Sequence, residues 1–305
     1  MSRLRSPLFL RTFLAARCFA ALLAAPTLHA QTVSFTFDDG FDPRSQPQAA
    51  EWNARMLKSL GDAGVKAAYF PAGRFVDSPE GLALVKAWGQ AGHIIGNHTY
   101  SHTDIDKVTV EAYTADIARN DALLRNLPNF RARLRFPYLR EGSTAARRDG
   151  VRAWLAKNGY KPAPVSIVTS DWYWDPRFAQ WLKAYPHGDI EPFRKAYLQH
   201  VWDRAEYSER LALGVLARSP PHVMLLHANL LNAMFLGDML AMFRAKGWTI
   251  VEAEAAFADP LYDRLPKGLP AGNGLLSELL KDTGRPPLPP GHEDHGKALI
   301  DALGY

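Results

Sequence analysis

The sequence predicts an α/β fold built on one parallel β-sheet, either closed into a barrel or open with helices on both faces. Three observations support this prediction. Short runs of β-branched and aromatic residues alternate with longer stretches of helical period along most of the chain. The chain has 305 residues, and 47% of them are hydrophobic, which is enough for one sizeable core. Its 22% of charged residues is typical of a globular protein rather than a disordered one.

Seven short runs rich in β-branched and aromatic residues are the predicted strands. They cover residues 33–37, 66–70, 93–95, 134–136, 165–168, 222–226 and 248–251. Stretches of helical period lie between them, at residues 47–63, 80–91, 110–127, 144–157 and 231–245. Such alternation is the pattern of consecutive βα units, in which the strands run parallel.

Two segments depart from this rhythm. Residues 176–218 form one long helical stretch rich in aromatic side chains, and we interpret them as an insertion. After residue 260 the chain becomes rich in Pro and Gly, so residues 261–305 are predicted to be a tail rather than a second domain. The expected organisation is therefore one domain over residues 31–260 that contains the insertion.

The first thirty residues have the features of an export signal, with a basic start, an apolar stretch at residues 19–25 and a small residue, Ala30, before Gln31. The apolar stretch is shorter than the roughly 20 residues that span a bilayer, so we expect cleavage near Gln31 and a periplasmic or secreted protein without stable membrane insertion. The segment holds four arginines and no acidic residue, and removing it lowers the formal net charge from +5 to +1. A nucleic-acid partner is therefore not expected.

Cys18 is the only cysteine, and it lies within the expected signal. The mature chain would then contain no thiol, no disulfide and no thiolate metal site. Any metal ion must be held by His and carboxylate side chains.

Asp38 and Asp39 stand where the first predicted strand ends, and Gly40 follows them. Parallel α/β folds place their functional sites at the carboxyl ends of strands. Adjacent residues in an extended chain point in opposite directions, so one carboxylate can bind a cation while the other has a different task. An Asp-Gly turn or a helix cap is the structural alternative for this pair.

His98 and His102 are four residues apart, which would place both imidazoles on one face if the segment makes a helical turn. Two neutral imidazoles and one carboxylate suit a catalytic zinc ion or a similar divalent ion, with positions left open for water and substrate. The alternative is a polar turn whose hydrogen bonds are internally satisfied.

His227 ends the apolar run 223–226 at another strand end, where it is a candidate general acid or a buried histidine with a hydrogen-bond partner. Arg135 and Asp171 also follow predicted strands. An arginine beside a carboxylate fixes its orientation and lowers its pKa, and an aspartate beside a histidine holds the ring and favours its protonated form.

These residues belong to five short motifs that occur in one order along the chain. The motifs are Thr36-Phe37-Asp38-Asp39-Gly40, His98-Thr99-Tyr100-Ser101-His102, Arg135-Phe136-Pro137-Tyr138, Asp171-Trp172 and Leu225-Leu226-His227. The set resembles the polysaccharide deacetylase family, also called the NodB-homology or carbohydrate esterase family 4 domain, over roughly residues 31–260. The family fold is a distorted (β/α) barrel of seven strands, so the resemblance implies a distorted (β/α)7 barrel here.

The resemblance also implies a role for each motif residue. The expected ligands of a divalent metal, most readily Zn²⁺, are Asp39, His98 and His102. The expected catalytic residues are Asp38 as the base toward water, Arg135 as its tether, the backbone N–H of Tyr138 toward the oxyanion, His227 as the acid and Asp171 as the residue that orients His227. The expected substrate-binding residues are Trp172 and Leu225, which would form the walls of the pocket for the acetyl methyl group.

The sequence departs from the common family pattern at three places. Because of these departures, the resemblance does not define the substrate groove. The departures are Phe41-Asp42-Pro43 after Gly40, Leu139 in place of a glycine after Tyr138, and Val168 in place of a further aspartate. None of them removes a residue with an expected chemical role.

The resulting hypothesis is a metal-dependent hydrolase that removes N-acetyl groups from an amino-sugar polysaccharide or oligosaccharide. Two related functions are the alternatives: an amidohydrolase acting on a small cyclic amide or imide, and an inactive carbohydrate-binding relative. The expected export signal argues against the first, and the presence of both Asp38 and His227 argues against the second. An iron oxygenase does not suit a chain that alternates helix and strand, and a serine hydrolase lacks its Gly-x-Ser-x-Gly motif here.

Overall fold

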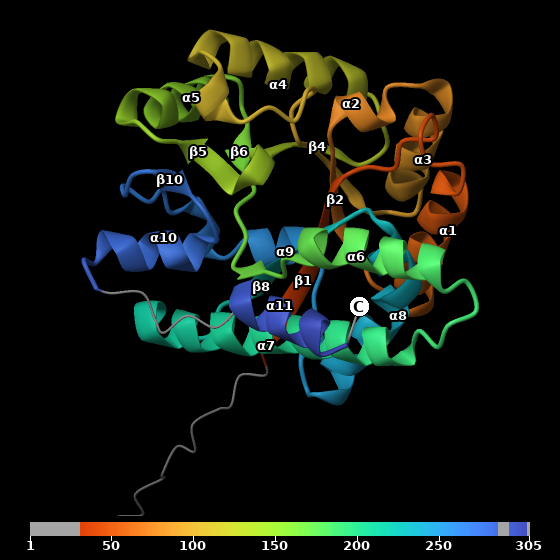
Figure 1. Ribbon diagram of the computed structural model, residues 1–305. Helices are drawn as coiled ribbons and strands as arrows, with labels where there is room; N and C mark the ends of the chain where they lie inside the picture. The colour runs from red at the N-terminus through yellow and green to blue at the C-terminus, as the bar shows by residue number, and fades with distance from the viewer. Residues whose placement is uncertain (1–30, 286–292, 304–305) are drawn as a thin grey trace, which may run out of the picture.

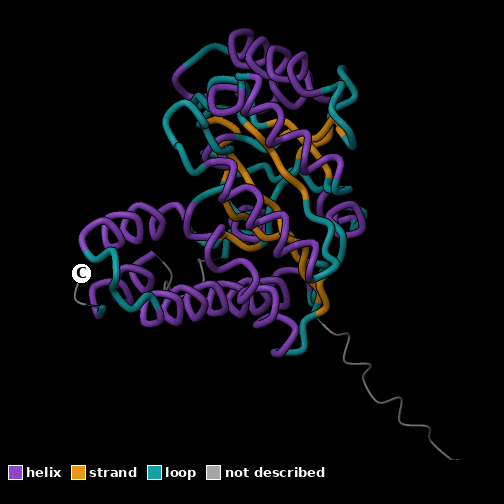
Figure 2. The backbone as a smooth tube through the Cα atoms, turned by 90° about the vertical axis from the view of Figure 1, so that its right-hand side faces the viewer, coloured by secondary structure: helices purple, strands orange, loops and turns teal. Residues whose placement is uncertain are grey.

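One curled parallel sheet surrounded by helices makes up most of the molecule (Figure 1). The structure is a computed structural model, and it describes residues 31–285 and 293–303. The export signal predicted for residues 1–30 lies outside the described residues. Figure 2 shows the strands at the centre, with helices on the outside and one long helix along the lower side.

Within the described residues the sheet has eight strands, and its main path runs in the order β6-β4-β3-β2-β1-β8-β7, with β9 paired to β1. Their bounds are β1 Thr32–Asp39, β2 Ala68–Pro71, β3 Ile94–Asn97, β4 Phe130–Leu134, β6 Lys161–Pro162, β7 Ile167–Val168, β8 His222–His227 and β9 Thr249–Ile250. Every pairing in this sheet is parallel. The seven strands of the main path form a half-barrel, which confirms the expected distorted (β/α)7 barrel.

Helices connect successive strands of the sheet. The α-helices are α1 Ala49–Asp62, α2 Gly73–Val76, α3 Pro79–Gln90, α4 Val110–Leu124, α5 Ala145–Lys157, α6 Asp171–Ala184, α7 Glu191–Leu216, α8 Leu230–Ala245, α9 Ala253–Phe257, α10 Leu275–Asp282 and α11 Glu293–Ala302. Four of them begin where a side-chain oxygen accepts a hydrogen bond from the first turn, at Ser78, Thr109, Thr144 and Asn229. These capping residues explain why the helix starts were predictable.

The alternation of side chains along β1 separates the core from the site. Phe35 and Phe37 face the large core formed with the outer helices. Thr36 and Asp38 therefore face the opposite, inner side of the sheet, and both are buried. On the neighbouring strand β8, Asp38 is in register with His227. Two polar side chains of the sequence motifs thus meet on adjacent strands of the inner face.

Several predicted elements differ from the structure. The predicted strand 134–136 is wrong in position, because β4 ends at Leu134 and Arg135 lies just beyond it. Pro137 has no N–H to donate to a neighbouring strand, which favours an early end of the strand. The strand β6, Lys161–Pro162, was not predicted, and it joins the main path of the sheet while β9 branches from β1.

The long stretch 176–218 is two helices, α6 and α7, rather than one. The segment after residue 260 also contains regular structure: its helix α10 buries Leu275, Leu276 and Leu279 in an apolar cluster on the inner side of the sheet. This segment therefore contributes to the core.

None of the helices found in residues 31–285 and 293–303 combines the length and the apolar character that crossing a membrane requires.

Candidate active site

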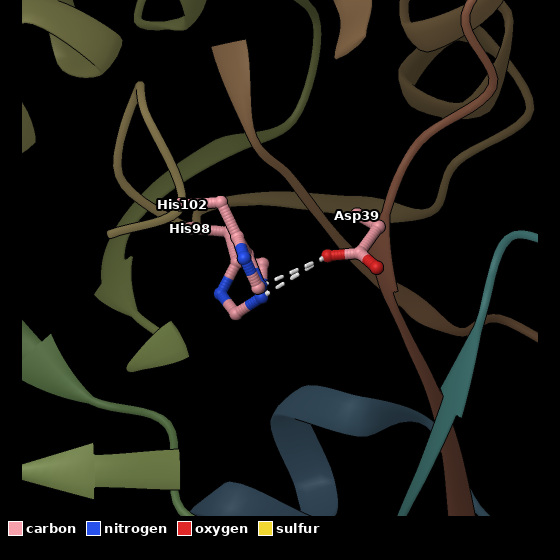
Figure 3. A group of neighbouring side chains, drawn as sticks. All are labelled: Asp39, His98 and His102. Carbon is pink, nitrogen blue, oxygen red and sulfur yellow. Dashed lines mark ion pairs between the residues drawn. The ribbon is translucent and has the colours of Figure 1, made fainter. Parts of the chain in front are cut away.

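Three side chains from two strand ends converge at the carboxyl edge of the sheet. His102 Nε2 lies 3.2 Å and His98 Nε2 lies 3.5 Å from Asp39 Oδ1. Figure 3 shows the two imidazole rings side by side, both facing this carboxylate. The donor atoms of all three residues lie within 4.8 Å of one another, a spacing that one metal ion could bridge. The structure thus contains a possible metal site made of two imidazoles and one carboxylate.

The hydrogen bond of His98 fixes which ring nitrogen carries the proton. His98 Nδ1 lies 2.7 Å from the backbone oxygen of Arg135. A carbonyl oxygen only accepts, so Nδ1 must donate, and the neutral ring then presents the lone pair of Nε2 toward Asp39. Metal-binding histidines are commonly oriented in this way, by a hydrogen bond from the ring nitrogen that does not face the metal.

The protonation of the other two residues also suits a cation. Burial lowers the pKa of His102 to about 4, so its ring is neutral at pH 7. Burial raises the pKa of Asp39, but the neighbouring imidazoles outweigh this effect and hold the pKa well below its usual range. Asp39 Oδ1 is buried and has no hydrogen-bond partner among the described residues. A buried carboxylate oxygen facing two imidazole nitrogens is a donor set that fits a divalent cation.

The loop that carries the two histidines is not the helical turn that their spacing predicted. β3 ends at Asn97, and both Thr99 and His102 have positive φ values, 58° and 52°. Asn97 Oδ1 accepts the N–H of Thr99, and Thr99 Oγ1 accepts the N–H of His102. Asp116 of α4 binds both the N–H and the hydroxyl of Ser101. Local hydrogen bonds rather than helical geometry therefore bring the rings together.

Asp38 is held by a buried arginine. Arg135 donates from Nη1 to Asp38 Oδ1 at 3.0 Å, from Nη2 to Thr36 Oγ1 at 3.0 Å and from Nε to the Ala163 oxygen at 2.6 Å. The second oxygen of Asp38 lies 3.7 Å from His98 Nε2, beside the candidate metal centre. Asp38 therefore keeps one oxygen bonded to Arg135 and the other directed toward that centre.

His227 is paired with an aspartate that is completely buried. His227 Nδ1 and the His227 N–H lie 2.7 Å from the two oxygens of Asp171. Burial lowers the pKa of His227, but the charge and the hydrogen bond of Asp171 outweigh it and raise the pKa to about 10. At neutral pH the ring therefore carries two protons, with Nδ1 bonded to Asp171 and Nε2 available as a donor.

A cavity of about 440 Å³ opens in front of these groups. Asp39, His227 and Trp172 line it, and the side chain of Trp172 is 57% exposed. Leu225 is not among its lining residues; it lies two positions before His227 on β8 and packs in the inner apolar cluster. Tyr138 is 59% exposed, and its ring meets His102 edge-on with centroids 4.6 Å apart.

Two asparagines of α8 were missed by the sequence analysis. Asn229 and Asn232 each donate a side-chain hydrogen bond to Asp171 Oδ2, at 3.1 Å and 2.7 Å. Asn229 is also the N-cap of α8, where its side chain accepts the N–H of Asn232. The Asn-x-x-Asn spacing indicates a helix start, but no local pattern indicates a distant aspartate as partner.

One model of a known protein family matches the N-terminal half of the described chain. The sequence model of the family described as polysaccharide deacetylase matches residues 25–162, which include Asp38, Asp39, both histidines of the candidate metal centre and Arg135. This part of the chain is therefore similar to the polysaccharide deacetylase family. The match ends before Asp171 and His227, so for these two residues the geometry described above is the main observation.

Curated deacetylases match part of this chain. A peptidoglycan-N-acetylglucosamine deacetylase of Bacillus cereus is 30% identical over 141 residues, which cover 46% of this chain and 46% of the relative. A peptidoglycan-N-acetylmuramic acid deacetylase of Bacillus subtilis is 33% identical over 82 residues, 27% of each chain. The chain thus spans about half, or less, of the length of the curated relatives that it matches.

Solved structures share the fold of this chain. A polysaccharide deacetylase of Bacillus cereus aligns with a TM-score of 0.53 and 21% identity, covering 74% of this chain and 94% of that one. A CE4 family pseudoenzyme of Bacillus anthracis aligns with a TM-score of 0.54 and 17% identity, covering 76% of this chain and 66% of that one. At these identities the likeness establishes the fold alone.

Proposed function

We propose that this chain is a metal-dependent hydrolase that removes N-acetyl groups from an amino-sugar polysaccharide or oligosaccharide. One observation carries the proposal: the two-histidine, one-carboxylate cluster lies beside Asp38, which Arg135 holds, and its Asp39 lines the same cavity as His227. The match to the family model and the deacetylase activity named for the curated relatives support the choice of substrate.

The proposal assigns one proton transfer to Asp38 and another to His227. A divalent ion held by Asp39, His98 and His102, most readily zinc, would lower the pKa of water toward about 7 and polarise the acetyl carbonyl. Asp38 accepts the proton of the attacking water through the oxygen that Arg135 does not bind. Because Arg135 also bonds to Thr36, the carboxylate keeps its orientation during the reaction.

The leaving amine needs a proton, since a neutral amine leaves far more easily than an amide anion. His227 donates this proton from Nε2, while Asp171 holds Nδ1 and keeps the ring charged until the transfer. The charge that develops on the carbonyl oxygen is met by the backbone N–H of Tyr138, and one such donor is typically worth about 10²–10³ in rate. Trp172, at the wall of the cavity, and Leu225 are proposed to contact the acetyl methyl group.

The location of the substrate follows from the same proposal. Peptidoglycan is the substrate named for two of the curated relatives, and it lies outside the cytoplasmic membrane. A periplasmic or secreted enzyme acting on an acetylated glycan is consistent with the export signal expected at residues 1–30.

Acetate release tests the function. Mature protein loaded with zinc is incubated with defined N-acetylated and O-acetylated glycans, with and without a chelator, and with a small cyclic imide as a competing candidate substrate. The expected result is metal-dependent acetate release from N-acetylated glycans. Ring opening of the imide without acetate release would favour the amidohydrolase alternative, and glycan binding without any turnover would favour the inactive relative.

A further inference from the structure

A short ribbon links the C-terminal segment to the turn that contains Tyr138. Strand β5, Arg140–Gly142, begins directly after this turn and pairs antiparallel with strand β10, Ala271–Gly272. In the register of this ribbon, Gly272 lies opposite Arg140. A segment more than 100 residues beyond the end of the family match therefore contacts the edge of the candidate site.

The turn itself has an unfavourable backbone conformation. Tyr138 and Leu139 both have positive φ values, 59° and 57°, and neither is a glycine. Consecutive non-glycine residues in this region persist only where surrounding structure holds them. The hydrogen bonds that close the turn run from the N–H of Leu139 to the Phe136 oxygen and from the N–H of Arg140 to the Pro137 oxygen.

Gly272 packs directly on this turn. Its φ is +116°, and a Cβ at this position would lie 2.2 Å from the backbone oxygen of Leu139 and 2.5 Å from Arg140 Cα. These contacts are with backbone atoms, which cannot move aside as a flexible side chain can. Only glycine therefore allows the C-terminal segment to approach this closely.

The C-terminal segment is itself firmly anchored. Asp282 of α10 accepts the N–H groups of Lys267 and Gly268, and Arg152 of α5 donates to the Pro266 oxygen at 2.8 Å. The leucines of α10 are buried in the inner apolar cluster, against which the side chain of Leu139 also packs. The turn is thus held from its carbonyl side by the ribbon and from its side-chain side by α10.

We propose that Gly272 is a positioning residue: through its contact with the Leu139 carbonyl it keeps the Tyr138 N–H in place for the developing oxyanion. This inference rests on the proposed function, in which that N–H stabilises the charge on the carbonyl oxygen. A hydrogen-bond donor in such a site acts only if it is held in the productive geometry before the reaction, so loss of the contact affects turnover more than binding.

The test compares Gly272→Ala with Gly284→Ala. Both substitutions put alanine at a positive φ, but Gly284, at +70°, has no heavy atom within 4 Å of its Cβ position. In Gly272→Ala we expect kcat for acetate release to fall by about 10- to 100-fold, with KM and zinc affinity within about twofold of wild type. Gly284→Ala should match wild type. Amide hydrogen exchange of residues 136–140 should become faster in Gly272→Ala alone.

Arg152→Gln provides a second route if Gly272→Ala does not fold, because it removes an anchor of the segment without a clash at the turn. A smaller decrease in kcat with faster exchange at residues 136–140 is expected. Equal kcat for Gly272→Ala and Gly284→Ala, measured where both are fully folded, would overturn the positioning role alone. A wild-type protein without acetate release on any N-acetylated glycan would overturn the proposed function as well.

Discussion

Arg135 and Asp38 form an ion pair with both side chains almost completely buried, with 3.0 Å between Nη1 and Oδ1. The two residues are 97 positions apart in sequence, and the guanidinium also bonds to Thr36 on β1 and to Ala163, which follows β6. One side chain therefore connects strands on both sides of the half-barrel. The same contacts that stabilise the fold also orient the proposed base.

Replacement of Arg135 by methionine should destabilise the protein strongly. Methionine fills a similar volume but leaves the buried Asp38 without a counter-charge, and breaking a buried pair in this way costs about 3–5 kcal/mol. The free energy of unfolding from urea denaturation measures this loss. Arg55→Met, which removes a surface pair with Glu51 on α1, is the matched control and should change stability little. Equal effects of the two substitutions would contradict a structural role for the buried pair.

Asp38→Asn separates the base from the metal ligands. The amide retains the size of the carboxylate but cannot accept the proton of water, so acetate release should fall by about 10²–10⁴-fold. Bound zinc should be unchanged, because the proposed ligands are Asp39, His98 and His102. Acetate assays and elemental analysis on the same samples measure both quantities. An asparagine variant with full turnover would show that Asp38 is not the base.

Metal removal should lower thermal stability as well as activity. A ligand that binds only the folded state stabilises it by about 2.7 kcal/mol at 100 times its Kd, so the melting temperature should rise with added zinc. His102→Gln should abolish this zinc dependence, while His187→Gln, at an exposed position between α6 and α7, should retain it. If zinc still stabilises the His102 variant, the proposed ligand set is incorrect.

The pH profile should report on His227. The protonated ring is the proposed acid, so kcat should fall as pH rises through its pKa, which Asp171 raises to about 10. In Asp171→Asn the carboxylate that favours the proton is gone, while burial still disfavours it, so the alkaline limb should move to lower pH. Steady-state rates between about pH 6 and 11 measure the alkaline limb in the wild type and in Asp171→Asn. The limb should be absent in His227→Ala; its persistence there would assign it to another group.

The sequence was most informative where the fold itself brings motifs together. Asp38, Asp39 and His227 end strands, and because parallel strands end at one edge of the sheet, their proximity could be predicted without coordinates. The relation of His98 to His102 was less predictable. Their spacing suggested a helical turn, whereas the actual loop depends on hydrogen bonds from Asn97 and Thr99 that no periodicity encodes.

Elements with little hydrophobic pattern were also missed. The strand β6 is a Lys-Pro pair without β-branched residues, and the arginines in β4 obscured its alternation. The role of the C-terminal segment was hidden for a different reason. Its Pro- and Gly-rich composition is typical of a tail, yet Gly272 is required by one close backbone approach that only the folded chain reveals.

Asn232 provides the last prediction, because no sequence pattern indicated its partner. Its amide donates to Asp171 Oδ2 and to the His227 oxygen, and its own oxygen accepts the hydroxyl of Tyr197. Asn232→Ala removes one of the groups that hold Asp171. We therefore expect kcat to fall about 10–100-fold, the usual effect of losing a hydrogen-bond partner that orients a functional side chain. The free energy of unfolding should also decrease, by about 1–3 kcal/mol, since buried partners lose their hydrogen bonds.

The control for Asn232→Ala is Asn53→Ala, which removes another buried amide; it bonds to Trp88, and neither residue lines the cavity. This variant should lose comparable stability but retain kcat. Rates measured at a temperature where both variants are fully folded separate the two effects. If the asparagines behave alike, Asn232 supports only the fold; a selective loss of kcat, with an alkaline limb displaced to lower pH, would show that it acts through the Asp171–His227 pair.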